Sequence, residues 1–62
     1  MTVYLLRWGR VYLVDHPSNG HWTTDADKAR RFQFQTSVNA VAMLHLNLST
    51  TEYVIEPFDV KE

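Results

Sequence analysis

The stretch that most constrains the fold is an apolar N-terminal run with a glycine in its middle. Residues 2–8 are mostly β-branched, aromatic or aliphatic and contain no breaker, so they predict a strand. Gly9 predicts a turn, because glycine adopts positive φ without steric cost. Residues 10–15 predict a second strand. The run therefore predicts a β-hairpin over residues 2–15.

Both faces of this hairpin are largely apolar. A hairpin with one face in water would alternate apolar and polar residues more regularly. The alternation places Tyr4, Leu6, Tyr12 and Val14 together on one face. We expect that either the loop at 16–24, which brings Trp22, or a partner protein covers this face.

Three signals predict the elements that follow the hairpin. Aspartates followed by basic residues predict a short helix near 25–31, because acidic side chains suit the positive end of the helix dipole. Thr36 and Ser37 are expected to cap the main helix, at 37–48. Residues 52–56 predict a third strand that ends at Pro57.

The main helix has a broad apolar stripe. At 100° per residue, one face holds most of the apolar side chains. That face comprises Val38, Val41, Ala42, Leu44, His45 and Leu48. Met43 and Leu46 fall outside its centre. The stripe is wider than one packing surface requires, which indicates a second contact.

The order of elements predicts a single small α+β domain over residues 1–62. A right-handed return through the main helix places the third strand beside the first. The expected sheet has three antiparallel strands in the order 2-1-3, with the helix 37–48 on one face and the short helix near 25–31. The second strand, 10–15, is then an edge that could pair with a strand of a partner or of a second copy.

Composition limits the classes of function. The chain has no cysteine, which favours a reducing cytoplasm and removes thiolate metal sites. No apolar run approaches the roughly 20 residues that a membrane span needs. His16 and His21 are two loop histidines without the three or four converging ligands of a metal site. Serine, threonine, histidine and aspartate are present, but no local motif groups a nucleophile with a base, and no phosphate-binding glycine loop occurs. We therefore expect no catalysis, no cofactor and no metal.

The net charge of −1 gives no overall attraction to nucleic acid. Tryptophan, tyrosine and arginine are the residues that most often anchor protein interfaces. The residues predicted to bind a partner are Trp8, Tyr12, Trp22, Lys28, Arg30 and Arg31. The alternative is nucleic-acid binding, in which cations contact phosphates and tryptophans stack on bases. That alternative uses Arg7, Arg10, Lys28, Arg30 and Arg31 with Trp8 and Trp22.

Most of the chain resembles the small uncharacterised accessory proteins of bacteriophages and prophages. Those proteins carry a tyrosine-containing hairpin, a Trp-Thr pair, an Asp-x-x-x-Ala-x-x-Phe stretch, a helix and a last strand. The matching residues are Tyr4, Tyr12, Trp22, Thr23, Asp25, Ala29, Phe32, Ala40 and Tyr53 to Ile55. The resemblance implies a protein that binds and modulates a host protein in the host cytoplasm. We also expect a homodimer, because the apolar area is large for one thin layer.

Overall fold

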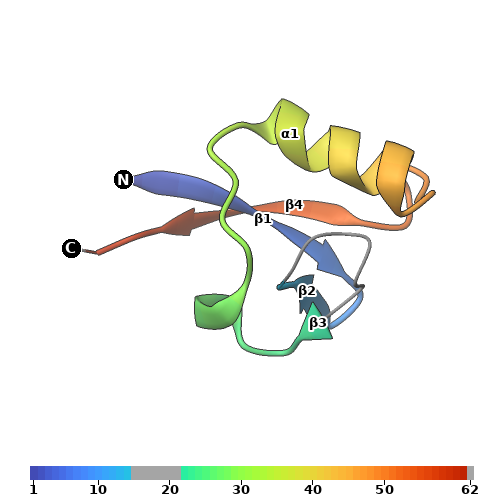
Figure 1. Ribbon diagram of the computed structural model, residues 1–62. Helices are drawn as coiled ribbons and strands as arrows, with labels where there is room; N and C mark the ends of the chain where they lie inside the picture. Colours follow the sequence, from blue (N-terminus) through green and yellow to red (C-terminus); the bar gives the residue numbers. More distant parts are fainter. Residues whose placement is uncertain (15–21, 62) are drawn as a thin grey trace.

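The computed structural model describes residues 1–14 and 22–61 and shows an α+β fold with an antiparallel sheet and one main helix (Figure 1). The class of fold predicted from the sequence is therefore confirmed. The elements in chain order are β1 (Thr2–Trp8), β2 (Val11–Leu13), β3 (Trp22–Thr23), the single 3-10 turn η1 (Ala26–Lys28), α1 (Gln35–Ala40), the π-helical η2 (Val41–His45) and β4 (Val54–Asp59).

The sheet has four strands in the order β3-β2-β1-β4, all antiparallel. The predicted neighbours of β1 are confirmed, and Gly9 takes the positive φ of 64° that the turn requires. The predicted number of three strands is wrong, because Trp22 and Thr23 pair with Leu13 and Tyr12. As a result β2 is not an edge strand. The predicted end of the second strand at Asp15, the loop at 16–20 and His21 lie outside the described residues.

The last strand continues through Pro57, so the predicted end at that residue is wrong. Pro57 lies opposite Tyr4 in the register of β1 and β4. Tyr4 directs both its N–H and its C=O to Phe32, at 2.8 and 2.9 Å, on the side of β1 away from β4. Tyr4 and Pro57 are therefore a non-hydrogen-bonded pair, and the proline nitrogen faces the free edge, where no donor is needed.

The predicted helix near 25–31 is reduced to the single turn η1. The Asp25 carboxylate caps this turn by accepting the N–H of Asp27 at 3.0 Å. The chain then becomes extended at Ala29. The N–H of Arg30 donates to the Leu13 carbonyl at 2.7 Å, and Phe32 exchanges two hydrogen bonds with β1. Competition from these sheet hydrogen bonds explains why the helix stops early.

The main helix covers residues 35–45, so both predicted ends, 37 and 48, are wrong. Phe34 is its N-cap and makes no side-chain capping hydrogen bond. The helix ends before Asn47, which has a φ of 55°. The N–H of Leu48 donates to the Ala42 carbonyl at 2.9 Å, which closes the helix with a left-handed turn.

The π-helical part of the helix changes which side chains face the sheet. The N–H of Leu46 donates to the Val41 carbonyl, five residues back. A π-turn holds more residues than an α-turn, so Leu46 rather than His45 packs against the core. The inward orientation predicted for Leu44 and His45 is wrong, since both side chains are exposed.

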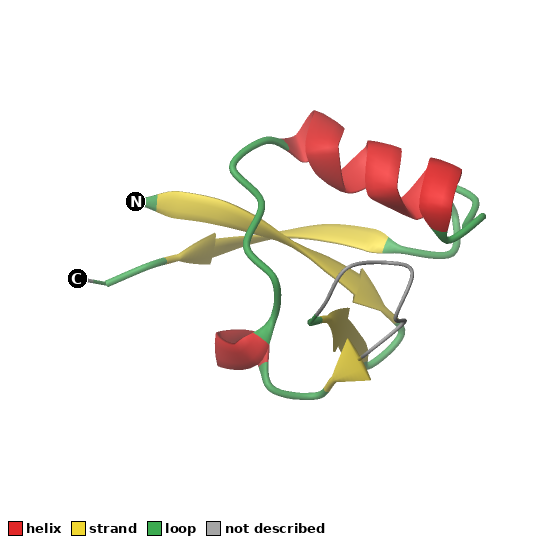
Figure 2. Cartoon of the chain, in the orientation of Figure 1, coloured by secondary structure: helices red, strands yellow, loops and turns green. Residues whose placement is uncertain are grey.

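The buried side chains form two clusters, one on each face of the sheet. Figure 2 shows the main helix lying along one side of the sheet. The helix lies over one face, which we call the helix face. Its cluster comprises Leu6, Leu13, Phe32, Val38, Ala42 and Tyr53. On the other face, which we call the open face, η1 covers a smaller cluster of Val3, Leu5 and Ala29.

The chain itself covers much of both hairpin faces. The sequence predicted that Tyr12 shares a face with Tyr4 and Leu6, and this prediction is wrong. Tyr12 pairs with Arg7 and therefore lies on the open face. Trp22 packs against the cluster of the helix face. The remainder of the loop proposed to cover this region lies outside the described residues. In the part of the chain that the structure describes, no helix has the length and apolar character of a membrane span.

Candidate functional site

The six residues predicted to bind a partner lie in separate places. Trp8 and Trp22 meet at the end of the sheet near the β1–β2 turn, with ring centroids 5.3 Å apart and planes tilted by 54°. Trp8 is half-exposed. The pair comes together because Trp22 lies beside Leu13 on the helix face and Trp8 shares that face. The tryptophans therefore form one partly exposed aromatic surface, which is the first location.

Tyr12 lies on the open face in a small polar network. The Arg7 Nε atom is 3.8 Å from Glu56 Oε2. A hydrogen bond with Glu56 is the main cause that raises the pKa of Tyr12, and partial burial and the negative charge of Glu56 act in the same direction. Arg7 also donates to the Gly9 carbonyl at 2.8 Å. These groups satisfy one another, so this second location offers little free charge.

Arg30 and Arg31 lie on opposite faces of the sheet. The Arg30 guanidinium carbon is 4.8 Å from the centre of the Phe32 ring, in the cluster of the helix face. The Arg31 guanidinium carbon is 5.9 Å from the Phe58 ring, on the open face. The two side chains diverge because residues 30–32 are extended, and successive side chains of an extended segment alternate. The exposed Lys28 ends η1.

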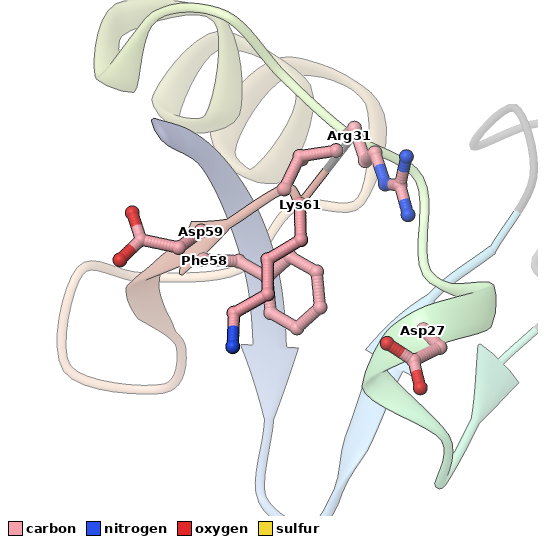
Figure 3. Close-up of a pocket in the computed structure, with 6 residues that line it drawn as sticks. Asp27, Arg31, Phe58, Asp59 and Lys61 are labelled. Carbon is pink, nitrogen blue, oxygen red and sulfur yellow. The ribbon is translucent and has the colours of Figure 1, made fainter. Parts of the chain in front are cut away.

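A hollow on the open face is the third location, and it includes Arg31 (Figure 3). Its volume is about 380 Å³. η1 and the segment after it supply one wall, and the end of β4 and the following residues supply the other. The hollow is lined by Asp27, Arg31, Phe58, Asp59, Val60 and Lys61.

The charges that face the hollow are net positive. The Asp59 carboxylate points away from the Phe58 ring (Figure 3) and accepts a hydrogen bond from the Thr2 hydroxyl at 2.8 Å. One carboxylate, that of Asp27, then remains against the two cations Arg31 and Lys61. Among residues 1–14 and 22–61, the one ion pair is Arg7–Glu56. The charges of Arg31 and Lys61 are therefore available to a ligand.

The hollow combines the Phe58 ring with two cations that form no ion pair with the described residues. An arginine fork binds carboxylate and phosphate groups through two parallel hydrogen bonds. The half-buried Phe58 ring offers an apolar surface directly under the Arg31 guanidinium. The arrangement suits a ligand that carries an anionic group beside an apolar group.

Sequence reasoning did not identify Asp27, Phe58 and Lys61 as site residues. Phe58 continues the alternation of Val54 and Glu56 on the open face. This alternation is visible in the sequence, but the predicted end of the strand at Pro57 excluded Phe58 from the strand. The proximity of Asp27 and Lys61 depends on the tertiary fold and has no local signal.

No metal site is formed by the described residues, since no three His, Asp or Glu side chains in them converge. The pair His16 and His21, weighed from the sequence, lies outside the described residues, as does Asp15. His45 is exposed near the end of the helix.

A comparison of the chain with protein-family models, curated proteins and solved structures gave no match.

Proposed function

We propose that this protein is a small non-catalytic binding protein that binds and inhibits a host protein in the host cytoplasm, as an accessory protein of phage or prophage type. The observation that carries the binding role is the hollow on the open face. There Arg31 lies over the Phe58 ring and has no ion-pair partner among the described residues. Arginine is one of the residue types that most often anchor protein interfaces.

The hollow selects a partner segment of defined chemistry. A carboxylate of the partner binds the Arg31 guanidinium, and Lys61 adds a second positive charge. An apolar side chain next to that carboxylate packs on the Phe58 ring. Asp27 repels a second acidic group at the other wall, so the site favours one acidic residue beside an apolar one over a polyacidic run.

The neighbouring arginine provides a matched control. Arg30 and Arg31 carry the same charge and each lies over a phenylalanine ring, but only Arg31 lines the hollow. The protein is immobilised and used to capture proteins from a bacterial host lysate, in parallel with Arg31→Gln and Arg30→Gln. We expect one host protein to be retained by the wild type and by Arg30→Gln and to be lost with Arg31→Gln. Identical captured proteins from all three variants would contradict the proposed site.

Nucleic-acid binding is the second candidate, and the pair of the exposed Trp8 and the partly buried Trp22 is the observation that favours it. Tilted tryptophans can stack on bases of a single strand. Titration with a single-stranded oligonucleotide should then quench tryptophan fluorescence, with an affinity that falls steeply as salt increases. Unchanged fluorescence at low salt would remove this candidate, whereas a salt-sensitive signal would favour it over protein binding.

A further inference from the structure

The segment from Phe32 to Thr51 contains no aspartate, glutamate, lysine or arginine. All six basic and all seven acidic residues of the chain lie outside it. The segment forms the whole main helix and the turns on both sides of it. A surface helix ordinarily carries charged residues on its solvent side, so the outer face of this helix is unusual.

The outer face is apolar in its middle, whereas Gln35, Thr36, Ser37 and His45 are exposed towards its ends. Leu44 is 76% exposed, Met43 50% and Phe34 63%. Ala40 is exposed one turn before Leu44, while Val38 and Ala42 are fully buried against the sheet. The π-turn contributes to this exposure, because it rotates Leu44 to the side opposite the core. We call the exposed set Ala40, Met43 and Leu44 the outer helix face, and Phe34, the N-cap, is not part of it.

We propose that the outer helix face binds the same face of a second copy of this chain, which gives a two-fold symmetric dimer. In such a dimer the same patch is used twice, so a residue near the axis meets its own copy. A charged residue there would meet a like charge, and a segment without charges avoids that repulsion. A partner of different sequence would allow complementary charges, and this face offers none to pair with.

The sheet edges do not provide an equally good route to self-association. On β4, Pro57 directs its nitrogen to the free edge and interrupts the row of donors. On the other side, β3 is only two residues long. A short strand and an edge proline both hinder pairing with another chain. Strand pairing between two copies is therefore disfavoured relative to helix contact.

The size of the face predicts a weak dimer. A helix over residues 35–45 is about 16 Å long. The small Ala40 side chain permits a close crossing, with axes about 8–10 Å apart. One such crossing covers less than the roughly 800 Å² per partner of a standard interface. We therefore expect dissociation in the micromolar range, so the dimer should be visible only as a function of concentration.

Sedimentation equilibrium of the full chain, from about 1 µM to 1 mM, tests the dimer. The wild type should shift from the mass of one chain to that of two. Leu44→Glu places like charges against each other and should weaken dimerisation at least about tenfold. Val54→Glu is the matched control, because Val54 is 46% exposed but lies on the open face, and this variant should dimerise like the wild type. Circular dichroism verifies that both variants are folded.

Charge pairing provides a second, independent measurement. An equimolar mixture of Leu44→Glu and Leu44→Lys should form a mixed dimer more tightly than either variant dimerises alone, because opposite charges then meet near the axis. A wild type that stays monomeric over the whole range would overturn the proposal and leave the face to a different partner. Equal dimerisation of wild type and Leu44→Glu, or equal loss with Val54→Glu, would overturn it too. The dimer does not depend on the hollow, so Arg31→Gln should dimerise like the wild type.

Discussion

The two faces of the sheet differ in what covers them. On the helix face, the helix and Phe32 enclose a cluster that includes the fully buried Leu6, Leu13, Val38 and Ala42. On the open face, Ala29 lies over Val3 and Leu5, and only partly buried side chains, those of Tyr12, Ala26, Phe58 and Val60, pack around them beside the charged groups. The difference indicates that one face provides most of the stability, whereas the other keeps a surface available for binding.

Adjacent residues allow this contrast to be tested with minimal chemical difference. Leu5 and Leu6 are neighbours in β1, are both completely buried and point to opposite faces. Arg30 and Arg31 are neighbours that lie over rings on opposite faces. Each pair compares the same change on two sides of one sheet.

The largest expected effect is that of the buried leucines. Leu6→Ala should lower the free energy of unfolding by about 4 kcal/mol, and Leu5→Ala by about 2 kcal/mol. The cost of a cavity depends on how well its surroundings collapse. Leu6 is held between sheet and helix, whereas Leu5 is covered by a short turn that can move inward. Urea denaturation followed by circular dichroism measures both changes.

A chain of this length has a total stability of about 3–9 kcal/mol. Leu6→Ala should therefore leave a large unfolded fraction in buffer, which Leu5→Ala should not. If the two variants are equally destabilised, the helix face does not dominate the stability.

Removal of two tyrosine hydroxyls, those of Tyr53 and Tyr12, should change the free energy of unfolding by an intermediate amount. The Tyr53 hydroxyl donates to Asn39 Oδ1 in a partly buried position between β4 and the helix. Tyr53→Phe should therefore cost about 1 kcal/mol of unfolding free energy. Tyr12→Phe removes the hydrogen bond to Glu56 on the exposed open face and should cost less at neutral pH. Equal losses in urea denaturation would show that the two hydroxyls are equally protected from water.

The dependence of stability on alkaline pH is a separate test of the Tyr12 hydrogen bond. Because the pKa of Tyr12 is raised in the folded protein, its stabilising contribution is complete below the ordinary tyrosine pKa. The contribution is lost as pH rises through the raised value. Thermal unfolding between pH 8 and alkaline pH should show a steeper decline for the wild type than for Tyr12→Phe. Parallel declines would mean that this bond does not persist in solution.

The smallest expected effect belongs to the turn that leads into β4, which lies on neither face. Glu52 accepts the N–H of Ser49 at 3.0 Å, and this bond, followed by the Ser49 hydroxyl, lowers the pKa of Glu52. The stabilising contribution is therefore complete above the ordinary glutamate pKa and is lost as pH falls through the lowered value. Glu52→Gln should flatten the acid limb of the melting-temperature profile slightly.

A second variant separates the two causes of the Glu52 shift. Ser49→Ala keeps the backbone donor and removes only the hydroxyl, so it should retain most of the acid dependence. If Glu52→Gln gives the same acid limb as the wild type, this turn does not contribute to folding.

Much of the fold was predictable because its signals are local. The strand at residues 2–8 and the turn at Gly9 depend on composition and φ preference, and the structure confirms both. The helix register was missed because a π-turn has no clear local signal and shifts every later residue. β3 has two residues and exists through pairing, so no periodicity could reveal it.

The candidate site was less predictable than the fold. The sequence grouped Arg30 and Arg31 as basic residues at the end of the predicted short helix. The sheet hydrogen bonds of Arg30 and Phe32 make this segment extended and send the two arginines to opposite faces. Phe58 became part of the site because the strand continues past Pro57, which the register with Tyr4 permits.

The most direct test of the central claim is a calorimetric titration of the captured host protein with wild type, Arg31→Gln and Arg30→Gln. If the open-face hollow is the binding site, Arg31→Gln should weaken the affinity for the host protein at least about tenfold. The affinity of Arg30→Gln should stay within about twofold of that of the wild type. Equal affinities for all three proteins, or a larger loss with Arg30→Gln, would contradict it.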